Sequence, residues 1–234
     1  MSSGGHPARL SRPLSPQCPR WPQGLRATVA AVILAVVGLK GGVGKSSLAA
    51  LLAQAAARTG RRVLLVDADP QASVVSWAED AAGLGEDVTV VALPMTRLDR
   101  ELRRLTAGFD EVVIDTPPGR GELGIVNAAA RASDLVLVPM APTLLDLDRL
   151  RPTLAVAEEQ GTPAVVVVNK ARAGTRSTRD VLEALGEVDD VAVLDTVVPL
   201  TERIAGAVGR RSVPAPIPDL WAELVAIAEA LDRG

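Results

Sequence analysis

Residues Ala31 to Leu51 read AVILAVVGLKGGVGKSSLAAL, and this stretch decides the fold of the chain. An apolar, β-branched run ends at Gly38. It is followed by a glycine-rich loop, by Lys45 and two serines, and by an alanine- and leucine-rich segment typical of a helix. A strand, a glycine loop, a Lys-Ser pair and a helix in this order are characteristic of a phosphate-binding P-loop. The sequence therefore predicts that the phosphates of a nucleotide bind here.

The residue types of the loop suit that chemistry. Gly41, Gly42 and Gly44 have no Cβ, so the backbone can take unusual dihedral angles and approach a phosphate closely. Their N–H groups can form an anion nest, and the helix that follows adds the positive end of its dipole. We expect Lys45 to bind the β- and γ-phosphates and Ser46 to offer its hydroxyl to Mg²⁺.

The spacing of this loop departs from the general P-loop pattern G-x-x-x-x-G-K-[ST], because Leu39 stands where the first glycine is expected. Residues 40–47 instead match K-G-G-x-G-K-[ST]-[ST]. This segment resembles the deviant Walker A box of the ParA/MinD family of ATPases, whose hallmark is an early second lysine. The nucleotide-binding residues that the resemblance implies are Lys40, Gly41, Gly42, Val43, Gly44, Lys45, Ser46 and Ser47.

The second lysine, Lys40, has two interpretations. The resemblance implies that it crosses a dimer interface and contacts the ATP phosphates bound by a second copy, which gives it a catalytic role beside Lys45. ATP would then be a dimerising ligand. The alternative is an ordinary exposed loop lysine.

The composition limits the classes of protein to which the chain can belong. With 234 residues, 48% of them apolar, it suits one domain with a buried core. A net charge of −3 carries no general nucleic-acid signature. The single cysteine excludes a disulfide framework and a cysteine-ligated cluster within one chain, and a reduced cytoplasm is the simplest compartment.

Residues 1–27 contain five prolines, four arginines and no acidic residue, whereas the rest of the chain has 21 basic and 28 acidic side chains. Such a segment cannot bury enough surface to fold. We expect a disordered, basic, proline-rich tail, or a segment before the true start of translation, and then one ATPase domain over residues 28–234. The apolar run at residues 28–39 is too short to span a membrane, so a buried central strand explains it better.

Short apolar runs alternate with helical patterns after the loop, which predicts an α/β fold whose twisted, predominantly parallel sheet has helices on both faces. The expected strands are Val63–Val66, Val88–Leu93, Glu111–Ile114, Leu135–Val138, Ala164–Val168 and Val191–Leu194. The expected helices are Ser46–Arg58, Pro70–Ala82, Arg97–Thr106, Leu123–Ala132, Leu144–Gln160, Thr178–Leu185 and Asp219–Leu231.

Acidic residues follow two of these strands, at the edge where such sheets bind ligands. Asp115 ends a Val-Val-Ile strand as a Walker B aspartate does, and we expect it to hold a water of the Mg²⁺ shell. Without the P-loop, an aspartate at the end of a strand would be explained equally well as a turn residue or a helix cap. The segment VLLVDADPQAS resembles the family's second acidic motif, which implies that Asp69 orients the attacking water while Asp67 supports the Mg²⁺ shell. The alternative for Asp69 is that it caps a helix begun by Pro70.

An asparagine and a later loop are the expected contacts of the adenine base. By resemblance, Asn169 binds the edge of adenine together with a backbone segment at residues 196–199, which ends at Pro199. The alternative for Asn169 is a residue in a turn.

Basic residues near the C-terminus are the candidate DNA contacts. The stretch Val197 to Ser212 resembles the region in which ParA proteins carry DNA-contacting residues, and Arg203 matches one of them. Arg210 and Arg211 could add contacts to phosphates without reading bases. Leu200 stands where relatives often have an arginine, which is a departure from the pattern. The alternative is that these arginines are merely solvated.

The resemblance extends over roughly residues 30–231 and is greatest to short ParA forms. It implies a Mg²⁺-dependent ATP hydrolase that dimerises with ATP, binds DNA non-specifically and positions a plasmid, chromosome or protein cargo over the nucleoid. A ParB-like or other cargo adaptor would stimulate hydrolysis.

Two alternatives stay open. The first is a MinD-like membrane-cycling ATPase, which needs a basic amphipathic terminal helix. The polar residues of the helix expected at Asp219–Leu231 are mostly acidic, so we expect this helix to pack on the core and the chain to bind no membrane. The second alternative is a scaffold that binds nucleotide without hydrolysing it.

Overall fold

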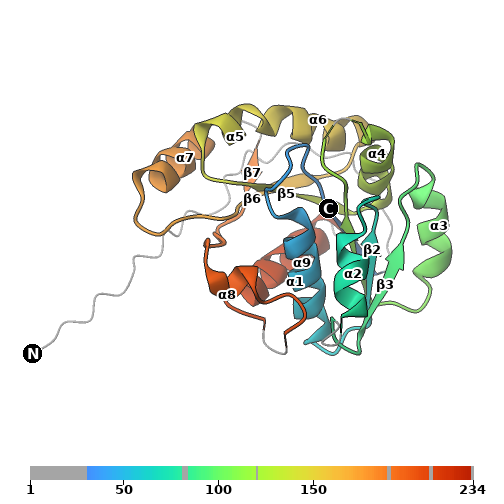
Figure 1. Ribbon diagram of the computed structural model, residues 1–234. Coiled ribbons are helices and arrows are strands. Elements are labelled where there is room, and N and C mark those ends of the chain that lie inside the picture. The colour runs from blue at the N-terminus through green and yellow to red at the C-terminus, as the bar shows by residue number, and fades with distance from the viewer. Residues whose placement is uncertain (1–30, 81–83, 120, 189–190, 211–212, 233–234) are drawn as a thin grey trace, which may run out of the picture.

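The structure is a computed structural model that describes residues 31–80, 84–119, 121–188, 191–210 and 213–232. Over these residues the chain forms three layers, with a central sheet between two layers of helices (Figure 1). The predicted α/β fold class is confirmed. The predicted tail at residues 1–27 lies outside the described residues.

Within the described residues the sheet has seven parallel strands in the order β3-β2-β4-β1-β5-β6-β7. Each inner strand is a mainly apolar run rich in valine, isoleucine or leucine, as a strand covered on both faces requires. The strands are β1 Val32–Val36, β2 Val63–Asp67, β3 Val88–Ala92, β4 Glu111–Asp115, β5 Leu135–Met140, β6 Ala164–Val168 and β7 Ala192–Val193.

Most of the helices connect successive parallel strands, and the last two follow β7. In the described residues they are α1 Lys45–Ala57, α2 Ser73–Glu79, α3 Leu98–Leu105, α4 Leu123–Ala132, α5 Leu144–Asp148, α6 Leu150–Gln160, α7 Arg176–Glu187, α8 Glu202–Ala205 and α9 Ile217–Asp232. None of these described helices combines the length and the apolar composition that crossing a membrane requires.

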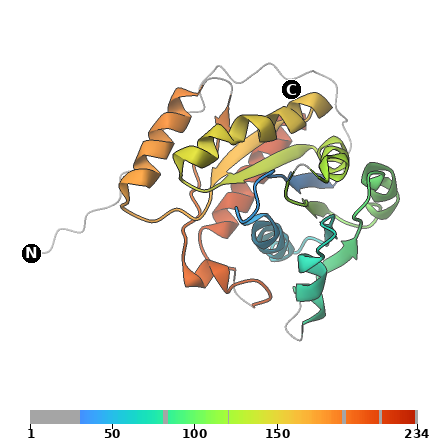
Figure 2. The same ribbon diagram turned by 45° about the horizontal axis from the view of Figure 1, so that its top comes forward.

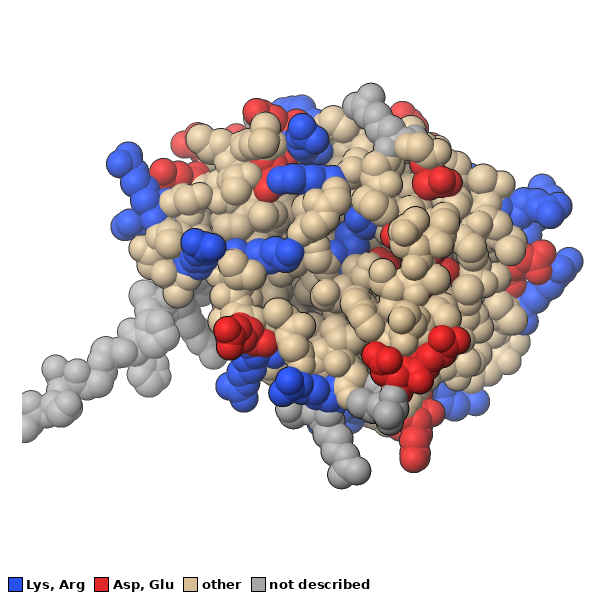
Figure 3. Space-filling view, viewed as in Figure 1, with Lys and Arg blue, Asp and Glu red and all other residues tan. Residues whose placement is uncertain are grey.

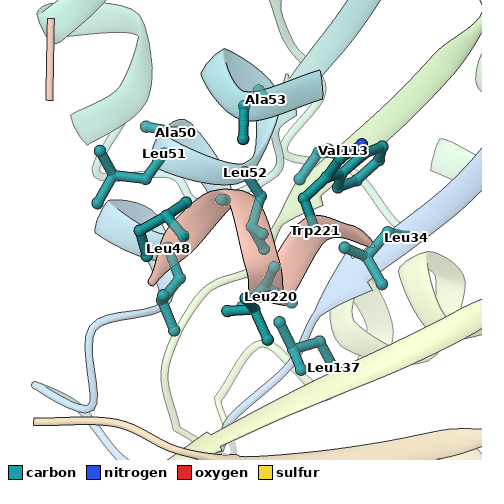
Figure 4. Packing of buried hydrophobic residues seen from close by; sticks show 14 of the residues in the cluster. Leu34, Leu48, Ala50, Leu51, Leu52, Ala53, Val113, Leu137, Leu220 and Trp221 are labelled. Carbon is teal, nitrogen blue, oxygen red and sulfur yellow. The ribbon is translucent and has the colours of Figure 1, made fainter. Parts of the chain in front are cut away.

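Two separate cores lie on the two faces of the sheet. Helices α1 and α9 pack on one face, and helices α3, α4, α6 and α7 pack on the other, an arrangement visible in Figure 2. Figure 4 shows Leu220 and Trp221 of α9 among the buried leucines of α1 and Leu34, Val113 and Leu137 of the strands. Helix α9 therefore packs on the core, as the sequence predicted.

Two predicted helices differ from those observed, and one observed helix was not predicted. The expected single helix from Leu144 to Gln160 is two helices, α5 and α6, which meet at Arg149. The helix expected to begin at Pro70 begins instead at Ser73, because Ala72 has a left-handed backbone (φ 53°) that no helix can include. The short helix α8 was not predicted.

The carboxyl ends of the central strands lie level with one another. Val36 of β1 is paired in register with Asp115 of β4, and Asp115 is paired with Asp67 of β2. The glycine-rich loop begins just beyond Val36, so both acidic residues lie beside the loop.

Candidate nucleotide-binding site

The glycine-rich loop joins β1 to the first residue of α1. Gly42 (φ 77°) and Gly44 (φ 93°) both have left-handed backbones, and the Gly44 carbonyl accepts the first intrahelical hydrogen bond, from the Leu48 N–H at 2.9 Å. Glycine avoids the steric penalty of this conformation. The Gly119 N–H also donates to the Leu39 carbonyl at 2.8 Å, which ties the segment after β4 to the loop. The predicted strand, loop and helix are thus present.

Lys45 is buried at the start of α1. Its side chain passes over Gly38, where an added Cβ would lie 3.4 Å from the lysine Cδ. Its Nζ donates to the Lys40 carbonyl at 3.5 Å. Burial lowers the pKa of Lys45, while the negative charges of Asp115 and Asp69 act in the opposite direction. The ammonium therefore lies among acidic residues inside the site, where a phosphate would be an additional anionic partner.

Asp115 is the residue best placed to act through a metal ion. It is fully buried, and among the described residues neither of its carboxylate oxygens has a hydrogen-bond partner of ordinary geometry. Burial raises the pKa of Asp115 to about 7; the nearby Ser46 hydroxyl and Lys45 ammonium oppose this increase. Unpartnered buried polar atoms are uncommon in folded proteins, and such an atom calls for an explanation such as an ion.

The oxygen atoms of this site suit Mg²⁺, which also takes ligands from phosphate and water, better than they suit a metal ion bound by protein side chains alone. The described residues contain no group of three or more His, Cys, Asp or Glu side chains that could hold a metal. Mg²⁺ in P-loop sites is bound by a serine or threonine hydroxyl, by phosphate oxygens and by waters. Ser46 and Asp115 have the chemistry that this kind of site requires.

Asp67 has a structural role that the sequence analysis did not foresee. One carboxylate oxygen accepts the Asp69 N–H at 3.1 Å, and the other accepts the N–H groups of Val74 at 2.9 Å and Val75 at 3.0 Å. These two residues are at the start of α2. Burial raises the pKa of Asp67, and its backbone hydrogen bonds partly offset that effect. Asp67 therefore caps α2 from seven residues upstream, and its support of a Mg²⁺ shell stays a prediction.

Asp69 does not cap a helix begun by Pro70, so this alternative is wrong. Its Oδ1 accepts the Gln71 N–H at 2.9 Å, and its carbonyl accepts the Ala72 N–H at 2.9 Å, which makes a turn before α2. The buried side chain lies close enough to Lys45 to influence its pKa. This position suits the predicted catalytic role, which stays a prediction.

Lys40 is paired within the same chain. Its Nζ forms an ion pair with Asp146 of α5, whose side chain is 3% exposed against 36% for Lys40. The other Asp146 oxygen accepts a hydrogen bond from the Thr143 hydroxyl at 2.8 Å, and the Thr143 hydroxyl accepts the Asp146 N–H at 3.1 Å. The sequence analysis missed Asp146, although Thr143 and Asp146 have the spacing of a capping box.

The predicted base-binding elements are neighbours. Residues 168–171 and 198–200 run side by side, with the Val198 N–H donating to Val168 at 2.9 Å and a bridge between Ala171 and Pro199. Glu223 of α9 accepts the N–H groups of Asp195 at 2.7 Å and Thr196 at 3.1 Å, and so holds the start of this segment. The Asn169 amide, however, binds the P-loop itself, as described below.

The candidate DNA contacts lie in and after α8. Arg203 and Arg210 are exposed, and the Arg210 carbonyl accepts a hydrogen bond from Gln54 of α1 at 3.4 Å. Arg211 lies outside the described residues. Figure 3 shows basic and acidic side chains interspersed over the face in view, so this view has no continuous basic surface.

A comparison with protein families finds one match over most of the chain. Residues 34–214 match the CobQ/CobB/MinD/ParA nucleotide binding domain. This range includes the glycine-rich loop, the acidic residues after β2 and β4, and the base-binding candidates.

Individual relatives and a solved structure agree with this match. Maintenance of carboxysome distribution protein A of Gloeobacter kilaueensis is 40% identical over 154 residues, which is 65% of this chain and 68% of that protein. A probable plasmid-partitioning protein ParA of Thermus thermophilus is 30% identical over 201 residues, covering 65% and 62% respectively. The ATP complex of a Cyanothece McdA variant superposes with a TM-score of 0.69 at 19% identity, covering 86% of this chain and 96% of that one.

Proposed function

The chain belongs to the CobQ/CobB/MinD/ParA family of nucleotide-binding domains, and on that basis we propose that it is a ParA-type ATPase. In this proposal it binds ATP with Mg²⁺, hydrolyses ATP, forms an ATP-dependent homodimer and binds DNA without sequence preference. A ParB-like or other adaptor on the cargo stimulates hydrolysis. The cargo is a plasmid, a chromosome or a protein assembly that is positioned over the nucleoid.

The observation that carries the ATPase proposal is the buried Asp115 carboxylate beside the P-loop, whose oxygens have no hydrogen-bond partner of ordinary geometry among the described residues. Phosphoryl transfer depends mainly on positioning and charge stabilisation rather than on covalent chemistry. Lys45 would bind the β- and γ-phosphates, Ser46 would bind the metal, and Asp115 would hold a water in its shell. Mg²⁺, when bound, neutralises charge on the β- and γ-phosphate oxygens. Asp69 would hold the attacking water in line.

The names of two similar proteins support the cargo function. One similar protein maintains carboxysome distribution, and another is a probable plasmid-partitioning protein. Both names describe the positioning of a large cargo. The proposal assigns the same kind of activity to this chain, without choosing between the cargoes.

The dimer proposal gives Lys40 two successive partners. In the single chain its ammonium is bound to Asp146 of α5. In an ATP-bound dimer, Lys40 would leave Asp146 and contact the phosphates held by the second copy. The Lys40 end of the ion pair is partly exposed, and water can solvate an ammonium there, so releasing it costs little on the Lys40 side.

The last described helix gives no support to a membrane-cycling function. The apolar face of α9 contains Leu220, Trp221 and Leu224, all of which are buried against α1 and the sheet. A membrane-binding helix must leave such a face free to enter the lipid.

Light scattering with a non-hydrolysable ATP analogue tests the dimer. We expect the wild-type chain to change from monomer to dimer, and Lys40→Ala to weaken this change more than it weakens nucleotide binding.

A phosphate-release assay tests hydrolysis. Asp69→Ala should bind ATP and dimerise but release no phosphate. Normal turnover in Asp69→Ala would refute its catalytic role. Dimerisation without phosphate release in the wild type, even with DNA and the adaptor present, would favour a scaffold.

Duplex DNA binding tests the arginine residues. A dimer would double the exposed arginines at α8, so the ATP-bound form should bind DNA and the nucleotide-free form should bind weakly. Affinity should fall by roughly 0.9 log units per phosphate contact for each log unit of salt. Arg203→Glu, or Arg210→Glu with Arg211→Glu, should abolish binding and leave the dimer intact. Loss of binding on deleting residues 1–27, with binding kept in the arginine variants, would move the DNA site to the tail.

A further inference from the structure

The end of strand β6 reaches across to the glycine-rich loop through two consecutive side chains. Asn169 donates from Nδ2 to the Val43 carbonyl at 2.7 Å, and Lys170 donates from Nζ to the Gly42 carbonyl at 2.6 Å. The two acceptors are consecutive residues of the P-loop. Two neighbouring side chains thus hold two neighbouring peptide groups, although more than 120 residues separate them along the chain.

The Asn169 side chain is fixed on both sides. Its Oδ1 accepts the Lys170 N–H at 2.9 Å while its Nδ2 binds the Val43 carbonyl. A carbonyl can only accept and an N–H can only donate, so these partners determine which way the amide points. The fit is also close, because a Cβ added at Gly44 would lie 2.6 Å from Nδ2. Gly44 is therefore needed for this contact as well as for its left-handed backbone.

Lys170 is unusual in both backbone and residue type. Its φ of 59° is one of two positive values for non-glycine residues in the described part of the chain, the other being that of Ala72. The chain has only three lysines among its 25 basic residues, and the other two are Lys40 and Lys45 of the loop. Every lysine therefore contacts or belongs to the P-loop. An ammonium is a compact charge with freely rotating donors, which suits a contact to one carbonyl.

The geometry of the peptide bond connects this contact to phosphate binding. A trans peptide is planar, so its C=O and the N–H that follows point in opposite directions. Holding the Gly42 carbonyl toward Lys170 therefore directs the Val43 N–H away from β6. Holding the Val43 carbonyl toward Asn169 does the same for the Gly44 N–H. These N–H groups are donors of the anion nest expected in a P-loop.

We propose that Asn169 and Lys170 are positioning residues that hold the P-loop in its phosphate-binding conformation, whatever base the nucleotide carries. The inference rests on the proposed function only in taking a nucleoside triphosphate as the ligand. It is independent of dimerisation, DNA binding and the cargo. It also changes the expectation for Asn169, whose loss should weaken the binding of phosphates as well as the binding of adenine.

A ligand without a base separates these roles. Inorganic tripolyphosphate with Mg²⁺ is titrated as a competitor of a fluorescent ATP analogue, against the wild type, Asn169→Ala and Lys170→Met. Each substitution removes a hydrogen bond to the P-loop, and the one from Lys170 is charge-assisted. We therefore expect each substitution to lower the affinity for ATP and the affinity for tripolyphosphate by about tenfold. Lys170→Arg keeps a charged donor and should restore most of the affinity. Arg176→Met is the matched control, because the Arg176 side chain is 89% exposed on α7 and should leave both affinities unchanged.

Weaker binding of ATP with unchanged binding of tripolyphosphate would overturn the proposal, since Asn169 and Lys170 would then act on the nucleoside. Unchanged binding of both ligands would overturn it as well. Circular dichroism and thermal unfolding show whether each variant is folded, and Asn169→Asp provides a second folded variant. It keeps the acceptor for the Lys170 N–H but places an oxygen against the Val43 carbonyl, so it should bind phosphates as poorly as Asn169→Ala. A wild type that binds ATP without hydrolysing it would count against the proposed function and leave this inference testable.

Discussion

The two ends of strand β4 present the same kind of residue in different surroundings. Asp115 at the carboxyl end and Glu111 at the amino end are both buried, and each has a carboxylate oxygen without a hydrogen-bond partner among the described residues. Burial is the main reason that the pKa of each is raised to about 7. Neither the exposed fraction nor the pKa distinguishes one carboxylate from the other.

What lies around each carboxylate does distinguish them. Asp115 is next to the glycine-rich loop, the Lys45 ammonium and the Ser46 hydroxyl. Glu111 instead forms an ion pair with Arg61, whose half-exposed side chain places Nη1 3.9 Å from Glu111 Oε1. Perturbed pKa values mark functional sites only with some probability, because structural ion pairs perturb them too. Here it is the meeting of strand ends with a helix N-terminus that separates a candidate site from a buried acid.

The largest expected effect comes from removing the basic partner at each end. Lys45→Ala takes a buried charge from the phosphate site, a change worth on the order of 4 kcal/mol, so ATP affinity should fall about 1000-fold. Arg61→Ala at the other end should leave ATP affinity unchanged. Fluorescent-nucleotide titration measures both, and a comparable loss in the two variants would remove the distinction between the ends.

The pH dependence of stability should identify Glu111. Its pKa is about 7 in the folded chain against 4.5 as the ordinary value, so the folded state binds more protons between these values. The contribution to stability is complete below pH 4.5, falls as pH rises through 7, and amounts to at most about 3 kcal/mol. Urea unfolding from pH 5 to pH 8 should show this decline in the wild type and a flatter profile in Glu111→Gln. An identical decline in Glu111→Gln would assign it to another group.

Turnover should respond only to the carboxyl end of the strand. Asp115→Asn keeps the size of the side chain but removes the charge that holds a water of the metal shell, so kcat should fall about 10- to 100-fold. Glu111→Gln should hydrolyse ATP at the wild-type rate. A phosphate-release assay at saturating ATP compares them, and equal turnover in both variants would exclude a catalytic role for Asp115.

The smallest effect concerns helix caps at the carboxyl edge. Thr143 and Thr201 each accept a backbone N–H three residues on, at the starts of α5 and α8. Replacing either by alanine should destabilise the chain by about 1 kcal/mol in urea unfolding. Only Thr143→Ala should also alter ATP-dependent dimerisation, because Thr143 holds the carboxylate that binds Lys40. The Thr201→Ala variant is the control for a purely structural effect.

Features that depend on neighbouring residues were predictable from the sequence. The alternation of apolar runs and helical patterns predicted the parallel sheet, and strand ends placed Asp115 and Asp67 beside the loop. Residue spacing within 40–47 located the phosphate site. These signals are local, because side-chain periodicity and glycine positions reflect the backbone of the same segment.

Features that depend on distant partners were missed. Asp67 caps a helix seven residues later, and Lys40 binds Asp146, which is 106 residues away. The hydrogen bond from the Asn169 amide to the P-loop was not foreseen, and the contact of Asn169 with a base stays a prediction. No local pattern encodes such pairs, since only the folded arrangement of the strands brings the partners together. The start of α2 was misplaced because Ala72 has a left-handed backbone, and the N–H groups at the start of this helix are capped by Asp67 rather than by Asp69.

The placement of the three lysines has a consequence for chemical labelling. Apart from one histidine, all other basic side chains of this protein are arginines, which do not react with amine-directed reagents at neutral pH. Apart from the amino terminus, such a reagent can therefore modify the chain only at Lys40, Lys45 and Lys170, around the nucleotide-binding loop. The extent of modification reports on that loop alone, and digestion after lysine yields peptides whose ends fall there. A bound nucleotide should thus be measurable as protection from labelling, without any engineered probe.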